Sequence, residues 1–310
     1  MKFSVGLQYE NDLFIEEILR CRASIEEVYF SWGDSDSGRG RATEHGSLSA
    51  FQLQKKQEAV LARLAEAGVR MNLLFNADCY GDASLSRALF EKIGDTTEEV
   101  LENFGLTSVT TTSPLIAKFI KANFPSLSVR ASVNMEIGTI EAMDYLKDLF
   151  DGFYMKREYN RDFDRIRELH GWCAAHGKTL HLLANSGCLN FCPARHFHDN
   201  LVAHESGIRK MDNAYVFEGL CHEFLKDPAN IEKLPERLNF IRPEELPAYE
   251  PWFSSVKLAT RVSRCPELIL KSYAEGKYAG DLLLLLEPAH SISPYVLENS
   301  DPPRIVKITE

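Results

Sequence analysis

Four cysteines in the second half of the chain have the type and spacing that a metal centre requires. Cys188 and Cys192 have three residues between them in a stretch rich in Asn, Pro and His, and Cys221 and Cys265 follow. Pro193 biases Cys192 toward an extended backbone, so the first two thiols lie on a turn and can face one ion or cluster. The chain has seven cysteines, an odd number spread unevenly, which fits free thiols and metal ligands better than a disulfide framework.

These residues leave the identity of the metal open. Four converging thiolates suit a 4Fe–4S cluster, in which each iron takes one cysteine sulfur. Zinc accepts the same four thiolates, or three of them with His196, His198 or His222. Unligated thiols are the third alternative, and Cys79 is an alternative fourth ligand in place of Cys265. Metal chemistry at this loop is therefore the main hypothesis that the sequence offers.

Eight short β-rich segments, with helical segments between them, must position these cysteines. Amphipathic patterns predict helices over Phe51–Gly68 and Asn160–Gly177. Repeated βα units without a Gly-rich phosphate loop after the first strand favour a closed (β/α)8 TIM-like barrel over an open doubly wound sheet. The predicted strands are Lys2–Gln8, Glu27–Ser31, Arg70–Phe75, Thr107–Thr110, Ser128–Ser132, Gly152–Met155, Thr179–Leu183 and Val256–Leu258.

The length of the chain and the long gap before the last strand suggest how it is organised. We expect one barrel domain over residues 1–310, with residues 188–251 as an insertion between the seventh and eighth strands. Such an insertion is longer than an ordinary βα loop and is expected to cover the C-terminal face of the barrel. Cys21 and Cys173 fall in line with apolar residues at helical spacing and are expected in the core.

Composition and charge narrow the classes of partner. A net charge of -10 and a pI near 5.5 give no strong signal for binding duplex nucleic acid. The leucine run Leu282–Leu286 is far too short to cross a bilayer, and the N-terminal stretch lacks the pattern of a secretory signal. We therefore expect a cytoplasmic protein that does not enter a membrane.

Several spaced segments resemble the collagenase-like peptidase family U-32, from about Ser128 to Leu286. Some members of that family resemble oxygen-independent hydroxylases of ubiquinone precursors and RNA bases. The resemblance implies a barrel and a four-cysteine iron–sulfur cluster, carried over here to Cys188, Cys192, Cys221 and Cys265. The segments that carry it are Arg130–Met135, Tyr154–Glu158, the cysteine loop, Phe240–Leu246 and Ser255–Arg261.

Polar residues at the predicted strand ends are the candidates for binding a substrate, because barrel enzymes act at the C-terminal ends of their strands. The cationic ones among them suit a carboxylate or phosphate, which favours a small anionic or nucleotide-like substrate. Arg39 and Arg41 are expected to be solvated, although they could close over a ligand. The candidates are Asn76, Ser132, Asn134, Lys156, Arg157, Lys257 and Arg261, with Gln8, Tyr9, Trp32, Asp34 and Asn185 beside them.

Two further alternatives concern these candidates. The alternative to substrate binding is that Lys156, Arg157 and Glu158 pair with one another at the surface. His196 and His198 are expected to support the metal site from outside its ligand set.

These observations give one leading function and two alternatives. The leading hypothesis is an iron–sulfur enzyme that performs oxygen-independent redox chemistry, specifically hydroxylation. The alternatives are a metal-dependent hydrolase or peptidase that uses a zinc-bound water, and a non-catalytic subunit whose cluster serves a protein partner. The sequence has no Gly-x-Ser-x-Gly elbow and no His-Glu-x-x-His helix, so hydrolysis by those two routes has no support.

Overall fold

Eight parallel strands form the centre of the structure. A computed structural model describes residues 1–33, 38 and 49–308, so Asp34, Arg39 and Arg41 lie outside the described residues. Neighbouring strands pair in the order β7-β6-β5-β4-β3-β2-β1-β8. The strands are β1 (Lys2–Gly6), β2 (Ile25–Phe30), β3 (Arg70–Phe75), β4 (Leu106–Thr111), β5 (Ser128–Ala131), β6 (Gly152–Tyr154), β7 (Thr179–His181) and β8 (Ser255–Leu258).

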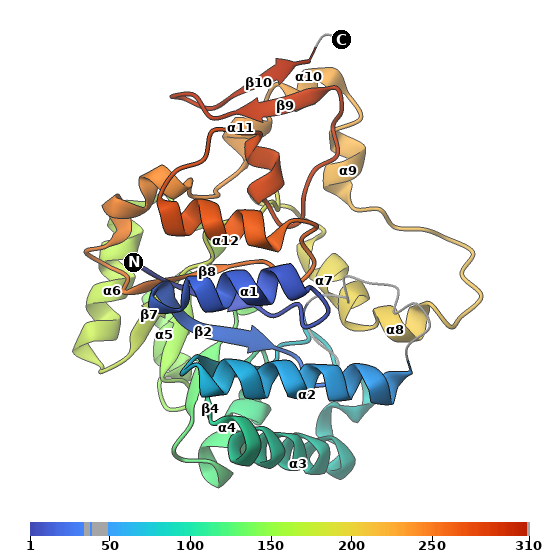
Figure 1. The fold of residues 1–310 in the computed structure, drawn as a ribbon, viewed down its shortest axis with the longest axis vertical. Helices are drawn as coiled ribbons and strands as arrows, with labels where there is room; N and C mark the ends of the chain where they lie inside the picture. The colour runs from blue at the N-terminus through green and yellow to red at the C-terminus, as the bar shows by residue number, and fades with distance from the viewer. Residues whose placement is uncertain (34–37, 39–48, 309–310) are drawn as a thin grey trace.

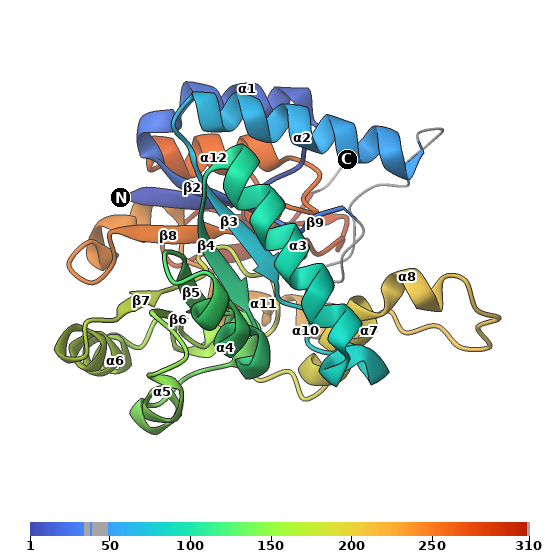
Figure 2. The ribbon, with the colours of Figure 1, turned by 90° about the horizontal axis from the view of Figure 1, so that it is seen from below.

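The first and last strands of that order close the ring. The backbone N–H of Ala184 donates to the carbonyl of Lys257, and the N–H of Lys257 donates to the carbonyl of Leu182, each at 2.9 Å. Leu183 and Lys257 therefore form a parallel bridge just beyond β7. The helices lie around the strands (Figure 2). The predicted (β/α)8 barrel is confirmed, and each of the eight predicted segments overlaps one strand.

Helices follow the strands along the chain and cover the outside of the barrel (Figure 1). The predicted helix Phe51–Gly68 corresponds to α2, which Ser49 caps by accepting a hydrogen bond from the N–H of Gln52 at 3.3 Å. These helices are α1 (Asp12–Arg20), α2 (Ala50–Glu66), α3 (Arg87–Phe104), α4 (Pro114–Asn123), α5 (Ile140–Leu146), α6 (Phe163–Ala175) and α12 (Pro266–Glu275).

The helix predicted from Asn160 begins later than expected. Arg157–Tyr159 forms a short 3-10 helix, η4, directly after β6. Asp162 then caps α6 by accepting a hydrogen bond from the N–H of Arg165 at 2.9 Å. The side chain of Asp162 therefore sets the start of α6.

The apolar core lies between the strands and the helices. Val5, Val28 and Val109 on the strands are fully buried and belong to the same cluster as Phe14 and Leu61 on the helices. Burying each such side chain contributes about 1.5–3 kcal/mol. Because apolar residues at alternate strand positions face the helices, the side chains between them face the inside of the barrel.

Two of the remaining cysteines belong to this core. Cys173 in α6 is buried, with 1% of its surface exposed, as predicted. Cys21 ends α1 and is half-buried, packed against the edge of the core.

The chain between β7 and β8 holds the cysteine loop and several short helices. Arg195, at the start of α7, makes ion pairs with Glu136 at 3.4 Å and Glu158 at 2.9 Å, which lie in the loops after β5 and β6. The segment between α8 and α9 runs outward before it returns (Figure 1). The elements are α7 (Arg195–Ala203), α8 (Glu205–Ile208), α9 (Leu220–Phe224), α10 (Pro228–Ile231), α11 (Leu234–Arg237) and the 3-10 helix η5 (Pro243–Tyr249).

A small sheet near the C-terminus was not predicted. After the 3-10 helix η6 (Leu282–Leu285), β9 (Tyr295–Glu298) and β10 (Arg304–Lys307) pair antiparallel to each other, apart from the barrel (Figure 1). The remaining 3-10 helices are η1 (Arg22–Ser24), η2 (Gly81–Leu85) and η3 (Val133–Met135). None of the helices in the described part of the chain has the length and apolar character needed to cross a membrane.

Candidate active site

The interior of the barrel is polar and is organised around one buried carboxylate. Glu27 on β2 is 1% exposed. It accepts hydrogen bonds from Ser4 and Asn72 at 3.1 Å, from Ser108 at 3.2 Å and from Arg130 at 2.6 Å. These donors stand on β1, β3, β4 and β5, so side chains of five strands meet inside the ring. Barrels are more commonly filled with branched apolar side chains, so this polar filling is a specific feature of the molecule.

Lys257 on β8 lies inside the ring near its C-terminal end. Its Nζ is 3.9 Å from the ring centroid of Tyr29 and 4.9 Å from that of Tyr154. The residue is 7% exposed. Burial, followed by the positive charge of Arg261, lowers the pKa of Lys257 to about 7. This lysine therefore combines a place at the barrel mouth with an amine that can lose its proton near neutral pH.

The remaining inward residues of this region are neutral. Burial lowers the pKa of His181 on β7 well below its usual value, and the ring of His181 packs 5.0 Å from that of Tyr154. Burial also raises the pKa of Tyr154 to about 12. The hydroxyl of Tyr29 donates to the carbonyl of Leu258 at 2.8 Å, which fixes the ring that Lys257 faces.

The seam between β7 and β8 is held by a buried amide. Asn185 donates to the carbonyls of Ala259 and Leu285, each at 2.9 Å, and accepts from the N–H of Ala259 at 2.6 Å. Ser186 forms a parallel bridge with Glu287. The cysteine loop therefore starts from a rigid point at the barrel mouth.

Three of the four predicted metal ligands, Cys188, Cys192 and Cys221, interact through their charges. Burial raises the pKa of the Cys221 thiol, and the charges of Cys188 and Cys192 raise it further. The Nη1 of Arg157, a residue that is 5% exposed, lies 3.9 Å from the sulfur of Cys188. Ser186 accepts a hydrogen bond from the N–H of Cys188 at 3.4 Å, which helps to hold the loop.

The fourth predicted ligand, Cys265, stands at the start of α12. Its N–H donates to Ser263 at 3.1 Å, and its charge contributes to a raised pKa of Tyr278, which burial raises most. As the side chains are arranged, no three His, Cys, Asp or Glu residues within the described ranges form a group that could hold a metal ion. The donor types of the three-cysteine group suit a metal, but the side chains would have to turn toward it. The ligand set stays a prediction.

The histidines of this region have different neighbours. The ring of His198 lies 3.7 Å from the position that a Cβ on Gly219 would take, and the sulfur of Cys221 lies 3.5 Å from the same point. His198 is therefore a neighbour of the cysteine group. His196 and His222 instead face Glu136 and Glu218, each at 3.3 Å.

Asn76, Ser132 and Asn134 form a second group, at the ends of β3 and β5. Ser132 accepts a hydrogen bond from the N–H of Asn134 at 3.3 Å, and the amide of Asn134 donates to Asp78 at 3.1 Å. Asn76 accepts from the N–H of Gly38 at 3.1 Å. A Cβ on Gly38 would approach the Asn76 carbonyl to 2.6 Å, so only glycine fits here. The structure brings these three predicted residues together.

The alternative that Lys156, Arg157 and Glu158 pair with one another at the surface is wrong. Arg157 and Glu158 are both buried, and Glu158 binds Arg195 of α7. Lys156 faces Glu136 at 3.7 Å. Arg157 lies between the cysteine loop and α7. Its guanidinium is 3.9 Å from the sulfur of Cys188 and 4.0 Å from the carboxylate of Asp199.

Sequence reasoning missed most of the polar barrel interior. The signal for the missed interior residues was the alternation along each strand, in which polar residues recur at every second position of segments that are otherwise apolar. Missed with them was Asp78, whose pKa is raised to about 6 by burial and then by the charge of Asp199. The missed interior residues are Ser4, Glu27, Tyr29, Asn72, Ser108, Arg130, Tyr154 and His181.

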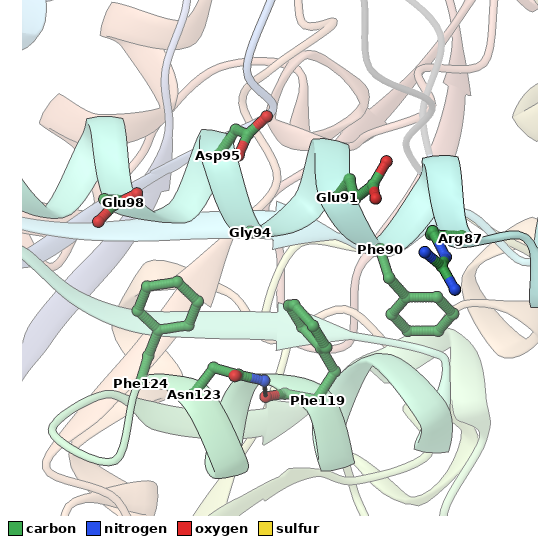
Figure 3. A pocket seen from close by; sticks show the side chains of 9 residues that line it. All are labelled: Arg87, Phe90, Glu91, Gly94, Asp95, Glu98, Phe119, Asn123 and Phe124. Atoms are coloured by element: carbon green, nitrogen blue, oxygen red, sulfur yellow. Dashed lines mark hydrogen bonds between the residues drawn. The ribbon is translucent and has the colours of Figure 1, made fainter.

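A pocket of about 600 Å³ lies elsewhere, between α3 and α4 on the outside of the barrel (Figure 3). The rings of Phe90 and Phe119 fill the space between these helices, 5.4 Å apart, whereas Glu91 and Asp95 point away from α4 (Figure 3). Its polar groups do not converge, so we do not assign the active site to it. The lining residues are Arg87, Phe90, Glu91, Gly94, Asp95, Glu98, Phe119, Asn123 and Phe124.

Comparison with known proteins supports the fold and leaves the family open. No protein-family model matches the sequence, and no curated protein matches it. Among solved structures, the U32 peptidase Mk0906 is similar over 84% of this chain and 92% of its own, with a TM-score of 0.56 and 12% identity. At this identity the likeness shows a shared barrel fold. The resemblance to family U-32 therefore stays a prediction.

Two further solved structures are similar at a lower level. A GH113 β-1,4-mannanase matches over 88% of this chain and 98% of its own, and a chitinase from Rhizomucor miehei over 89% and 100%. The identities are 10% and 12%, and both TM-scores are 0.46.

Proposed function

We propose that this protein is a barrel enzyme with an iron–sulfur centre, which carries out oxygen-independent redox chemistry, specifically hydroxylation. The observation that supports the proposal is that the charges of Cys188 and Cys192, in the loop after β7, act on the thiol of Cys221. With Cys265 as the fourth ligand, these thiolates would hold a 4Fe–4S cluster. Bound there, such a cluster supplies one-electron transfer.

The protein groups around the cysteines suit such a centre. Four thiolates bring negative charge to the loop, and the buried guanidinium of Arg157 beside Cys188 offsets part of it. Asn185 and Ser186 anchor the loop to the seam of the barrel. These hydrogen bonds would help to orient the ligands of such a centre.

The substrate we propose is small and anionic or nucleotide-like, bound at the barrel mouth. Arg261 brings positive charge to the end of β8 beside Lys257, and Asn76, Ser132 and Asn134 offer polar contacts at the ends of β3 and β5. Positive charge in a cleft with low-dielectric walls attracts anions. These residues would orient the substrate toward the cysteine loop.

A zinc site is the second candidate, and one observation favours it. The His198 ring and the Cys221 sulfur both lie beside Gly219, so His198 can join the three cysteines as a fourth zinc ligand. Such a set fits a structural zinc, or a hydrolase if one ligand gives way to water. A cluster that serves only a protein partner is the third candidate.

Metal analysis separates these candidates. We would measure iron, acid-labile sulfide and zinc in anaerobically purified protein, and in Cys188→Ala, Cys192→Ala, Cys221→Ala, Cys265→Ala and His198→Ala variants. About four irons per chain, lost in all four cysteine variants and kept in His198→Ala, is the expected result. Zinc lost in His198→Ala and kept in Cys265→Ala would replace the cluster with the zinc site.

Cys21→Ala is the control, because Cys21 is half-buried at the far end of α1 and has no place in the ligand set. A protein that folds but holds no stoichiometric metal of either kind would refute both metal proposals.

A further inference from the structure

Residues 210–218, which we call the projecting segment, lie between α8 and α9 and extend away from the rest of the chain (Figure 1 and Figure 2). All nine of these residues are exposed. Tyr215 and Val216 are 92% and 88% exposed, and Met211 is 69% exposed. Single exposed apolar side chains are ordinary, but three large ones on one short segment indicate an interaction surface.

The backbone of the projecting segment is open to pairing. From Asp212 to Glu218, no N–H or C=O group makes a backbone hydrogen bond to any residue that the structure describes. An extended stretch of this kind is a template for another extended chain, as at the edge of a sheet. The segment contains no proline, and Tyr215, Val216 and Phe217 are of the types that favour strands.

The order of charges along the projecting segment is complementary to a second copy that runs in the opposite direction. Lys210 stands at one end and Glu218 at the other. If two copies pair antiparallel about Ala214, Lys210 of each lies opposite Glu218 of the other. Both side chains are accessible: Lys210 is exposed and has no ion pair among the described residues, and Glu218, 56% exposed, faces only His222 at 3.3 Å. Because such a contact is two-fold, the lysine–glutamate pair occurs twice.

The same register brings the apolar side chains together. Alternate residues share a face, so Met211 lies opposite Phe217, and Asn213 opposite Tyr215, all on one face of the ribbon. On its own chain, the ring of Phe217 already packs at 5.1 Å against that of Phe197 in α7. A two-stranded ribbon alone is marginally stable in water, and the exposed ring of Phe197 gives it a helix to pack against. The other face of the ribbon carries Lys210, Asp212, Ala214, Val216 and Glu218.

We propose that the projecting segments of two copies of this chain pair as an antiparallel ribbon, with the two-fold axis at Ala214, and so make the protein a dimer. A second copy is favoured over an unrelated partner because the charges and the apolar residues of the segment are both complementary to the segment itself. Pairing in the same direction would instead set lysine against lysine. This inference goes beyond the proposed function and does not depend on a metal.

Charge reversal tests the pairing. The full chain, as purified, is studied by sedimentation equilibrium over a range of concentrations, and we expect the mass to rise from 35.1 kDa toward twice that value. Lys210→Glu alone and Glu218→Lys alone should each raise the dissociation constant of the dimer at least about tenfold, because two attractive pairs become two repulsive ones. The double variant should return to within about threefold of wild type, since opposite charges face one another again.

Lys233→Glu is the matched control, because Lys233 is an exposed lysine of the same insertion that lies outside the projecting segment. This variant should leave the dissociation constant unchanged. A monomer at every concentration would overturn the proposal and leave the segment for a different protein. A dimer that both single variants leave intact, or that the double variant does not restore, would overturn it as well.

Cross-linking tests the position of the axis. In the proposed ribbon Ala214 lies opposite its own counterpart, with about 4.5–5.5 Å between the two Cβ atoms. Ala214→Cys should therefore link two copies through position 214 in the presence of glutathione disulfide, and peptide mass spectrometry locates the link. Asp212→Cys should not link to itself, because its two copies are offset by four residues, about 13 Å along the ribbon. Equal linking at positions 212 and 214, or none at 214, would refute this register.

Discussion

Replacing Glu27 by glutamine should destabilise the protein strongly, because Glu27 accepts hydrogen bonds from four side chains at the centre of the barrel. Glutamine keeps the shape of the side chain but removes the negative charge. Arg130, whose side chain is 11% exposed, then loses its partner at 2.6 Å. The new amide N–H₂ would also face the amide of Asn72 or the hydroxyls around it, so that one donor meets another.

The expected loss follows from these contacts. Removing one partner of a buried ion pair costs about 3–5 kcal/mol, since the other charge stays buried without compensation. We expect the free energy of unfolding of Glu27→Gln to fall by that amount in urea titrations followed by circular dichroism. The double variant Glu27→Gln with Arg130→Met should recover part of the loss, because the stranded charge is gone.

Glu26→Gln is the matched control. Glu26 is the neighbouring residue in β2, but it faces outward and pairs with Arg70 and, at 3.9 Å, with Lys2. A surface pair of this kind contributes about 0–1 kcal/mol. Equal losses in the Glu26 and Glu27 variants, or no recovery in the double variant, would refute the assignment of Glu27 as the buried centre of the barrel.

Two further predictions concern Lys257 and the glycines. The pKa of Lys257 is about 7 in the folded protein and near 10.4 in the unfolded chain, so the unfolded chain binds more protons between these values and stability rises with pH across them. Relative to Lys257→Met, wild-type stability should thus rise by roughly 4 kcal/mol from pH 7 to pH 10.4 in urea titrations, and a flat difference would contradict the burial of this amine. Gly6→Ala should lower the melting temperature, at a cost of about 1–3 kcal/mol, because its Cβ would lie 2.5 Å from Arg261 and 2.8 Å from Tyr29. Gly171→Ala, in the open middle of α6, should instead stabilise by up to about 1 kcal/mol, and a loss in both variants would point to a general intolerance of alanine.

The sequence was sufficient to predict the strands because their signal is local. Each strand alternates side chains between the apolar layer and the interior, and helices with clear caps separate the strands. The residues at the strand ends could be predicted for the same reason, and Asn76, Ser132 and Asn134 do lie together at the ends of β3 and β5. The C-terminal sheet of β9 and β10 was not predicted, because its residues lack this alternating pattern.

The interior could not be predicted because it depends on register. Glu26 and Glu27 are adjacent and chemically alike, yet one pairs with lysine and arginine outside and the other lies at the centre of the barrel. The register of β1 and β2, in which Ser4 pairs with Glu27, and the closure of the ring together determine which of the two glutamates faces the interior. The same holds for the fourth cysteine, since the place of Cys265 depends on how the chain turns after β8 rather than on its spacing.

The closure of the barrel also joins Lys257 to the start of the cysteine loop. The main chain of Lys257 is bonded on one side to Leu182 and on the other to Ala184, and the next residue, Asn185, carries the cysteine loop away from the same seam. Lys257 and the start of the cysteine loop therefore lie on the same seam, two bonded neighbours along the closure of the barrel.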